Sequence, residues 1–211
     1  MAYEALILDL DGVICFTDHY HYLAWKSLAD ELGVYFDERI NNRLRGVSRM
    51  VCLDIILEKY GRPLSADEKE ALAEKKNDRY RELLRNMSTA DLSDEVRFTL
   101  DALRQKGLKL AIGSSSRNAP MILSRIGLEG YFDAISDGNN ITRSKPDPEV
   151  FIKAAEMLGL APPVCLVVED AKAGIEAAVA GGFSSAAIGD AVKCGLATHK
   201  LSTFSDLLKV V

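Results

Sequence analysis

A chain of 211 residues can bury a core of its own, so the sequence fits one domain or one domain with a large insertion. It has 31 acidic and 26 basic residues and a net charge of -5, which argues against a broad nucleic-acid interface. No uninterrupted apolar stretch approaches the roughly 20 residues that span a bilayer, so we expect no membrane partner.

The cysteines and the first residues favour a protein of the reducing cytoplasm. Cys15, Cys52, Cys165 and Cys194 are widely spaced and form no C-x-x-C pair, so we expect reduced thiols rather than a zinc site. The sequence passes from Met1 straight into an apolar run without the pattern of a signal peptide. We therefore expect a cytoplasmic protein, and we take it to be a monomer.

Short, mainly apolar runs predict a parallel sheet. They occupy residues 5–10, 108–112, 165–168 and 184–188, and helix-like segments separate the later runs. Runs that are apolar along their whole length suit strands covered by helices on both faces, with ligands at their carboxyl ends. The expected fold class is α/β, with a Rossmann-like parallel-sheet core.

A long helical interval, residues 19–103, separates the first two strands and is too long for a single crossover connection. Helices are predicted over residues 19–32, 49–60 and 66–87. The last helix follows the capping-box pattern Ser65-x-x-Glu68. We therefore predict an inserted α-helical cap domain over residues 16–88 and a core formed by residues 1–15 and 89–211.

The sharpest chemical feature is Asp9-Leu10-Asp11-Gly12, at the end of the first apolar run. Residues two apart on a strand share a direction, so one carboxylate can attack phosphorus while the other exchanges a proton with the reacting oxygen. Gly12 permits a sharp turn close to a ligand. Taken alone, such a string caps a loop about as often as it catalyses, so the rest of the chain must decide.

Three further segments follow in the order that a phosphotransfer site requires. Residues 113–118, Gly-Ser-Ser-Ser-Arg-Asn, offer hydroxyls and amides to phosphoryl oxygens. Lys145 precedes paired prolines and is therefore held on a rigid turn. Glu169 and Asp170 form a second acidic pair at a strand end. Singly, these segments have structural explanations, but two acidic clusters at neighbouring strand ends repel one another and favour a cation.

An all-oxygen site made of Asp9, Asp11, Glu169 and Asp170 suits Mg²⁺, which also takes oxygens from a phosphate. The cation and Lys145 would neutralise the transferring group, and such stabilisation is mostly electrostatic. The sequence therefore predicts a magnesium-dependent phosphotransferase with Asp9 as its nucleophile, acting on a small phosphorylated molecule such as a sugar phosphate.

In their order and context these segments resemble the four motifs of the haloacid dehalogenase superfamily. The matching residues are Asp9, Asp11, Ser114, Lys145, Glu169 and Asp170. The insert also resembles that of the β-phosphoglucomutases, members of the superfamily with a helical cap. This second likeness is carried by Thr17, His21, Ala24, Trp25, residues 45–49 and residues 75–77. The resemblance covers nearly the whole chain and is weakest after Asp190.

The resemblance implies a function for each matching residue. Asp9 becomes the aspartyl-phosphate of a transiently phosphorylated protein of carbohydrate metabolism, and Asp11 is the general acid and base. Ser114 and Lys145 hold phosphate, and a cis bond is expected before Pro146. The implied Mg²⁺ positions are Asp9, the backbone carbonyl of Asp11, Glu169 and Asp170. Substrate positions are Trp25, Gly46, Val47, Ser48, Arg49 and Lys76 in the cap, and Ser115, Ser116, Arg117 and Asn118 in the core.

In the cap, Arg49 would bind the far phosphate of a bisphosphate intermediate, while Thr17 and His21 belong to the catalytic set, His21 coupling cap closure to Asp11. Taken singly, Trp25 and His21 fit a packed core and Arg49 a solvated helix start. Their joint occurrence at the family's spacing favours function, above all for Arg49 and His21. The hinge position that is usually polar in the family carries Phe16 here, and Ser93-Asp94-Glu95 replaces a usual Pro-Gly.

The expected reaction interconverts β-D-glucose 1-phosphate and glucose 6-phosphate through glucose 1,6-bisphosphate. A sugar-phosphate phosphatase with the same nucleophile is the alternative, and a catalytically silent binding protein is a remote one. The presence of both Arg49 and His21 favours the mutase over the phosphatase. A hydrolase needs neither a second phosphate-binding site nor a residue that delays attack by water. The intact Asp9, Asp11, Lys145 and Asp170 oppose the silent protein.

Overall fold

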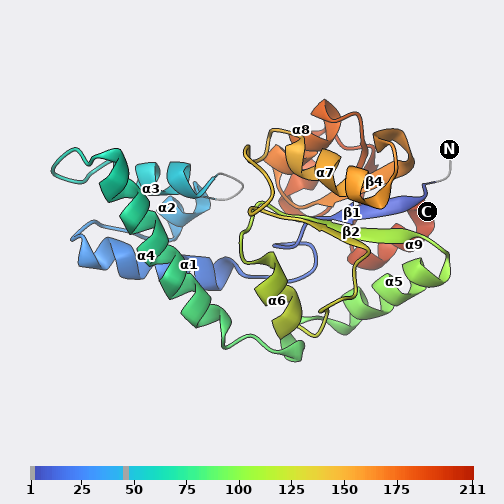
Figure 1. Ribbon diagram of the computed structural model, residues 1–211, viewed down its shortest axis with the longest axis horizontal. Helices are drawn as coiled ribbons and strands as arrows, with labels where there is room; N and C mark the ends of the chain where they lie inside the picture. The colour runs from blue at the N-terminus through green and yellow to red at the C-terminus, as the bar shows by residue number, and fades with distance from the viewer. Residues whose placement is uncertain (1–2, 45–47) are drawn as a thin grey trace. The chain divides into compact units, whose positions relative to one another are not determined.

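A computed structural model describes residues 3–44 and 48–211 of the chain (Figure 1). The chain divides into two compact units, and each is described by itself. The core unit comprises Met1–Phe16 and Ser88–Val211, and the helical unit comprises Thr17–Met87. The helical unit is therefore inserted between the first strand and the rest of the core unit.

Within the described residues, six parallel strands form one sheet in the order β3-β2-β1-β4-β5-β6. The strands are β1 (Ala5–Leu8), β2 (Lys109–Gly113), β3 (Ala134–Ser136), β4 (Cys165–Glu169), β5 (Ser184–Ala187) and β6 (His199–Lys200). Leu8 at the end of β1 lies opposite Ile112 on β2 and Val168 on β4. The predicted α/β class with a Rossmann-like parallel sheet is confirmed. In such a sheet ligands bind at the carboxyl ends, where the strand order reverses beside β1.

Helices cover both faces of this sheet (Figure 1). On one face α7 (Glu149–Leu158) packs against β1, β2 and β3, and α8 (Lys172–Ala180) packs against β4 and β5. The other face carries α5 (Asp94–Gln105), α6 (Ala119–Arg125) and α9 (Leu207–Val210). Short 3-10 helices complete the unit at Thr89–Asp91, Pro162–Val164, Gly189–Cys194 and Phe204–Asp206.

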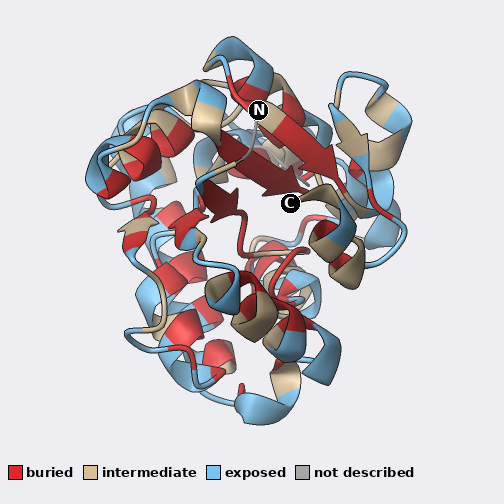
Figure 2. Ribbon diagram, turned by 90° about the vertical axis from the view of Figure 1, so that its right-hand side faces the viewer, coloured by how far each residue is buried: buried red, intermediate tan, exposed pale blue. Residues whose placement is uncertain are grey.

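The double cover explains the sequence of the central strands. Every residue of β1 and β4 is buried, and Figure 2 shows the sheet in the colour of buried residues. On the face of α7 and α8, Ile7 and Val167 share a cluster with Phe151. A strand that is buried on both faces has no solvent side, so its apolar residues run on without alternation.

The helical unit consists of α1 (Asp18–Glu31), α2 (Glu38–Asn42), α3 (Arg49–Leu57) and α4 (Ala66–Leu84), and α4 packs against α1 and α3. Its own core includes Trp25, Phe36 and Leu53. The predicted capping box is confirmed: Ser65 Oγ accepts a hydrogen bond from Glu68 N at 3.2 Å, and a Glu68 carboxylate oxygen accepts one from Ser65 N at 2.8 Å. Both α3 and α4 end three residues before their predicted ends, at Leu57 and Leu84.

Some predicted details were wrong. Strand β1 ends at Leu8 rather than at residue 10, because the chain turns there and the amides of Ile14 and Cys15 both donate to the Leu10 carbonyl. Strand periodicity therefore does not relate Asp9 to Asp11. The sequence also gave no signal for β3 and β6, which have only three and two residues. No helix within residues 3–44 and 48–211 combines the length and apolar character needed to cross a membrane.

Candidate active site

The carboxyl ends of β1 and β4 bring two acidic side chains together at the point where the strand order reverses. Asp9 follows β1, and its amide donates to the Val168 carbonyl at 2.9 Å. Glu169 is the last residue of β4, and both carboxylates are buried. Lys145 Nζ lies 2.5 Å from Asp9 Oδ1 and 2.5 Å from Glu169 Oε1. Three motifs that are far apart in the sequence therefore meet at one ammonium group.

The charges of this group are strongly coupled. Burial raises the pKa of Glu169 to about 7; Lys145 opposes the shift and the Asp9 carboxylate adds to it. Burial alone would lower the pKa of Lys145, but Asp9 and Glu169 outweigh burial and raise it above its ordinary value. Lys145 is therefore an ammonium. One ammonium does not neutralise two carboxylates, so the site favours a further cation.

A third carboxylate completes an oxygen-only cluster. Asp9, Glu169 and Asp170 each offer an oxygen within 4.8 Å of the others. Hard oxygen ligands of this kind are those that Mg²⁺ prefers, so these residues fit the predicted metal. The side chain of Asp11, which the sequence had included in the all-oxygen site, is not among these three. The family resemblance implied the Asp11 backbone carbonyl instead, and that position stays a prediction.

Two glycines let the backbone approach these carboxylates. Gly12 has φ +88°, and a Cβ there would lie 2.2 Å from Asp170 Oδ2. At Gly174, in the first turn of α8, a Cβ would lie 1.9 Å from the Glu169 carboxyl carbon. The sequence indicated the turn at Gly12. It did not indicate Gly174, whose only signal is a glycine five residues after a strand-end glutamate.

The serine-rich segment after β2 is organised by its own hydroxyls. Ser114 is buried, and its amide donates to the Ser136 carbonyl at 3.0 Å. Ser114 Oγ accepts from Ser116 N at 3.2 Å, and Ser116 Oγ accepts from Asn118 N at 3.2 Å. Asn118 is buried, whereas the neighbouring Ser115 and Arg117 are exposed. The hydrogen bonds hold the segment in a compact turn at the same sheet edge as Asp9.

Asp11 lies in the turn that follows Asp9, where Gly12 N donates to the Cys15 carbonyl at 2.7 Å. Burial raises the pKa of the Cys15 thiol, and the Asp11 and Asp9 carboxylates raise it further. Cys15 is therefore an unreactive thiol despite its position beside the acidic residues. All four cysteines are free thiols in the structure, as the sequence predicted.

In the helical unit, α1 and α4 bring His21 and Lys76 together, with Lys76 Nζ 2.8 Å from His21 Nδ1. The same ammonium lies 4.6 Å from the ring centre of Trp25 and 4.7 Å from that of Tyr80, and the Tyr80 ring stacks on His21 at 4.0 Å. Tyr80 is a residue that sequence analysis missed, although it lies one helical turn after Lys76.

His21 is neutral in this setting. Burial lowers its pKa well below 6.5, and the charges of Lys76 and Arg49 lower it further. An ammonium has no lone pair to accept a hydrogen bond, so His21 Nδ1 accepts from Lys76 and the ring proton is on Nε2. Trp25 is part of the unit's core, as one of its two readings predicted, and it also contacts Lys76; its role in substrate binding stays a prediction.

Three further predicted residues of the helical unit, Arg49, Ser48 and Thr17, lie at helix starts. Arg49 begins α3; its Nη2 donates to Asn77 Oδ1 at 2.9 Å, and its Nη1 lies 3.5 Å from a Glu74 oxygen. Ser48 caps α3 by accepting from Val51 N. Thr17 precedes α1, and its carbonyl accepts from His21 N at 3.1 Å. Gly46 and Val47 lie outside the described residues.

Comparison with known families agrees with this geometry. The model of the haloacid dehalogenase-like hydrolases matches residues 3–182. The chain belongs to this family. The match spans the helical unit and all four of the motifs named above, so the resemblance predicted from the sequence is confirmed. As that resemblance implied, the Lys145–Pro146 bond is cis.

Individual relatives in the haloacid dehalogenase family include both mutases and phosphatases. The chain is 39% identical to the β-phosphoglucomutase of Bacillus subtilis over 188 residues, covering 88% of this chain and 83% of that protein. It is 33% identical to the phosphorylated carbohydrates phosphatase of Thermotoga maritima, covering 85% and 82%. The crystal structure of a β-phosphoglucomutase from Clostridium difficile matches with a TM-score of 0.90 and 35% identity, over 97% of this chain and 93% of that chain.

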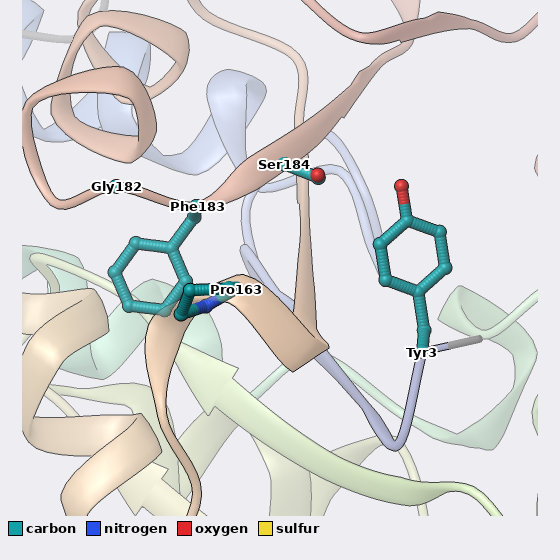
Figure 3. A pocket seen from close by; sticks show the side chains of 5 residues that line it. All are labelled: Tyr3, Pro163, Gly182, Phe183 and Ser184. Carbon is teal, nitrogen blue, oxygen red and sulfur yellow. The ribbon is translucent and has the colours of Figure 1, made fainter. Parts of the chain in front are cut away.

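A hollow at the other edge of the sheet is separate from this family's motifs. It is lined by Tyr3, Pro163, Gly182, Phe183 and Ser184, at the amino ends of β1, β4 and β5 (Figure 3). The Tyr3 hydroxyl and His199 Nε2 are hydrogen-bonded at 2.8 Å. None of the five lining residues is a carboxylate, a lysine or an arginine, and the acidic cluster lies at the opposite, carboxyl ends. The hollow is therefore not part of the candidate site.

Proposed function

We propose that this protein is a magnesium-dependent β-phosphoglucomutase that interconverts β-D-glucose 1-phosphate and glucose 6-phosphate. The observation that carries the proposal is that each unit has its own basic side chain suited to a phosphate: Lys145, beside Asp9 and Glu169, in the core unit, and Arg49 in the helical unit. A bisphosphate intermediate requires two phosphate-binding sites, whereas simple hydrolysis requires one. The 39% identity to the B. subtilis enzyme supports the same reading.

The reaction proceeds in two transfers through Asp9. In the first, the C6 hydroxyl of β-glucose 1-phosphate attacks the phosphorus of phospho-Asp9, Asp11 takes the hydroxyl proton, and glucose 1,6-bisphosphate leaves the Asp9 carboxylate free. After the intermediate turns, Asp9 attacks its C1 phosphate. Asp11 returns the proton to the C1 oxygen, which releases glucose 6-phosphate and regenerates phospho-Asp9.

The core unit supplies the electrostatic part of this chemistry. Ser114 and Lys145 bind the oxygens of the transferring phosphoryl group, and the ionised state of Lys145 suits this task. Glu169, Asp170, one Asp9 oxygen and the Asp11 carbonyl would hold Mg²⁺, which when bound would neutralise charge on the same oxygens. Ser115, Ser116, Arg117 and Asn118 would contact the substrate from the serine-rich segment.

The helical unit supplies substrate recognition. Arg49 binds the far phosphate, and Trp25, Gly46, Val47, Ser48 and Lys76 shape the sugar site. His21 offers an Nε2–H donor whose tautomer is set by Lys76. Together with Thr17 at the start of α1, this donor couples the position of the cap domain to Asp11, so that a sugar hydroxyl rather than water receives the phosphoryl group.

A phosphatase that uses the same nucleophile is the second candidate. The observation that favours it is the 33% identity to the T. maritima phosphatase and the 31% identity to the fructose-1-phosphate phosphatase of Escherichia coli. In that reaction water attacks phospho-Asp9 and inorganic phosphate is released. A catalytically silent binding protein is disfavoured, because Asp9, Lys145 and Glu169 form a connected group.

One assay separates the two reactions. The protein is incubated with β-glucose 1-phosphate, Mg²⁺ and a trace of glucose 1,6-bisphosphate, and glucose 6-phosphate and inorganic phosphate are measured in parallel. A mutase forms glucose 6-phosphate with little phosphate release. Release of inorganic phosphate as the main product would contradict the mutase and support the phosphatase.

A substitution in the helical unit tests the second phosphate site. Arg49→Ala should reduce mutase turnover far more than hydrolysis of a simple aryl phosphate, which has no second phosphate. Arg79→Ala is the matched control, because Arg79 is an exposed arginine of the same unit that pairs with Glu82. Equal losses of both activities in Arg49→Ala would argue against a second phosphate site at Arg49.

A further inference from the structure

The segment that leads to Lys145 is held by a carboxylate outside the active site. Glu149 is the first residue of α7. One of its oxygens, Oε2, accepts three hydrogen bonds: from Thr142 N at 3.0 Å, from Thr142 Oγ1 at 2.9 Å and from Arg143 N at 2.8 Å. Side chain and backbone of the segment just before Lys145 therefore converge on one oxygen atom.

The second half of the arrangement is Lys153, one helical turn further along α7. Its Nζ lies 3.0 Å from Glu149 Oε1 and also donates to the Asn140 carbonyl. Glu149 and Lys153 together thus bind two backbone amides, those of Thr142 and Arg143, and one backbone carbonyl, that of Asn140. An exposed i,i+4 pair usually contributes little. This one is different in kind, since the Glu149 side chain is only 12% exposed and both partners also bind the segment.

The chain on the other side of Lys145 is tied to the same helix start. Asp147 N donates to the Ser144 carbonyl at 3.1 Å, which closes a turn around Lys145, and Asp147 Oδ1 accepts from Glu149 N at 3.0 Å. Lys145 therefore lies between two attachments to Glu149. Residues 140–148 belong to no strand or helix. The position of Lys145 is therefore set by these side-chain hydrogen bonds and not by the backbone hydrogen bonds of the sheet.

The charge of Glu149 is constant under ordinary conditions. The Lys153 hydrogen bond, with those from Arg143 and Thr142, lowers the pKa of Glu149 to about 2, although partial desolvation opposes the shift. The carboxylate accordingly stays ionised at any pH at which the enzyme would work. The arrangement is a fixed structural support and not a pH switch.

We infer that Glu149, together with Lys153, is a positioning residue that holds the backbone on which Lys145 reaches Asp9 and Glu169. The inference rests on the phosphate-binding role proposed for Lys145. Neither Glu149 nor Lys153 touches the reacting atoms; they act through the 140–144 segment. A displacement of about 1 Å at a catalytic group can cost on the order of 100-fold in rate, so a support of this kind has a large expected effect.

The competing explanation is that Glu149 only stabilises α7, since an acidic residue in the first turn interacts favourably with the helix dipole. The two explanations differ in what they predict for Lys145. Simple helix stabilisation would lower the melting temperature of a Glu149 variant and leave Lys145 and the kinetic constants of the folded enzyme unchanged.

The direct test follows the chemical accessibility of Lys145. The intact protein is treated briefly with acetic anhydride, and acetylation of each lysine is quantified by peptide mass spectrometry. The side chain of Lys172 is 70% exposed and serves as the internal standard. In Glu149→Ala we expect Lys145 to be acetylated at least about 10-fold faster relative to Lys172 than in the wild type, because a released lysine is more exposed and less strongly protonated.

The kinetic test uses matched variants. We expect Glu149→Ala to lower kcat by roughly 10- to 100-fold, Glu149→Gln to be intermediate because it keeps an acceptor oxygen, and Glu156→Ala, an exposed glutamate of the same helix, to match the wild type. In a Lys145→Ala background, Glu149→Ala should add little further loss. If Glu149→Ala does not fold, Lys153→Met and Glu149→Gln provide the same comparison.

Unchanged acetylation of Lys145 in folded Glu149 variants, or additive losses with Lys145→Ala, would overturn the inference. The acetylation result does not depend on turnover. It therefore stands or falls separately from the proposed mutase activity, which the glucose 6-phosphate assay decides.

Discussion

Each unit of this protein buries a lysine, and the two units do so in different ways. Lys145 lies between the carboxylates of Asp9 and Glu169. Lys76, in the helical unit, contacts a neutral imidazole nitrogen of His21 and the faces of two aromatic rings. Removing an ammonium from water costs several kcal/mol, which opposite charges can offset in one case and a lone pair with ring quadrupoles in the other.

The difference matters for function. The core lysine is one member of a group with excess negative charge, so its site favours a metal cation before a phosphate can approach. The helical-unit lysine instead acts on a titratable neighbour: with burial, it keeps His21 neutral and sets its tautomer. Charge changes should therefore have large effects in the core unit and smaller ones in the helical unit.

The largest effect is expected when one anion facing Lys145 is removed. Asp9→Asn keeps the size of the side chain but has no nucleophilic carboxylate, so turnover should fall by at least roughly 10⁴-fold. Intact-mass spectrometry should find no phosphoenzyme. Asp78→Asn, an exposed position in the helical unit, is the control and should keep both properties. Retained turnover in Asp9→Asn would mean that the nucleophile is another residue.

Removal of the ammonium itself tests the two burial modes directly. Lys145→Met should lower kcat by roughly 10²- to 10³-fold, because one stabilising contact to the transferring group is lost. It should also lower the free energy of unfolding without Mg²⁺ by about 3 kcal/mol, since two buried carboxylates lose their counter-charge. Added Mg²⁺ should recover part of that stability, measured by urea unfolding.

Two matched variants complete this measurement. Lys172→Met removes an exposed lysine paired with Glu176 and should change stability little. Lys76→Met should destabilise the protein less than Lys145→Met, because Lys145 is the counter-charge of two buried carboxylates. A loss in Lys76→Met that equals or exceeds the loss in Lys145→Met would break the comparison between the two units.

A smaller effect is expected from moving Glu169 without changing its charge. A Cβ at Gly174 would collide with the Glu169 carboxylate, so Gly174→Ala should displace one proposed metal ligand. We expect the Mg²⁺ concentration for half-maximal activity to rise by roughly 10- to 100-fold, with activity recovering at high Mg²⁺. Gly61→Ala is the control, because among the residues that the structure describes no non-neighbouring atom lies within 4 Å of a Cβ there. An unchanged Mg²⁺ requirement would argue against Glu169 as a ligand.

The smallest effect concerns pH and the neutral partner of Lys76. His21 stays neutral in the folded protein, whereas the unfolded chain protonates it below about pH 6.5. Below this pH the unfolded state binds more protons than the folded state. The contribution of His21 to the free energy of unfolding is therefore fully present above pH 6.5 and falls as the pH decreases below it. Between a pH well above 6.5 and one unit below it, the free energy of unfolding of the wild type should fall by about 1.4 kcal/mol more than that of His21→Asn.

Urea unfolding at several pH values, with saturating Mg²⁺ to keep Glu169 ionised, measures this difference. Subtracting the His21→Asn curve removes the contributions of the other titrating groups. Equal pH dependence in the two proteins would show that His21 titrates normally, and the proposed neutral tautomer would then be wrong.

The sequence predicted the parts of the fold that have strong local patterns. Strands β1, β2, β4 and β5 were found because strands buried on both faces have continuous apolar runs. Strands β3 and β6 were not found, since three and two residues carry no pattern and their pairing depends on neighbours such as Ala111 beside Ala134. The helix of residues 66–84 was found from its capping box, and its end was not, because no strong stop signal follows Leu84.

The candidate site divides in the same way. The motif residues Asp9, Lys145 and Glu169 were singled out from their positions after apolar runs and on a proline-flanked turn. Three supporting features were not anticipated: the stacking of Tyr80 on His21, the close approach of Gly174 to Glu169, and the attachment of the 140–144 segment to Glu149 and Lys153. Each depends on geometry that no spacing rule contains.

By itself, the sequence determined that acidic, hydroxyl and basic groups gather at one edge of a parallel sheet, because parallel strands end at a common edge and the motifs follow those ends. Only the tertiary structure decided that Lys145 Nζ lies between Asp9 and Glu169, and that Lys76 lies against His21. Lys145 and Asp9 are 136 positions apart, and Lys76 and His21 are 55 apart. Contacts at such separations are set by how helices and strands pack, and local patterns do not encode them.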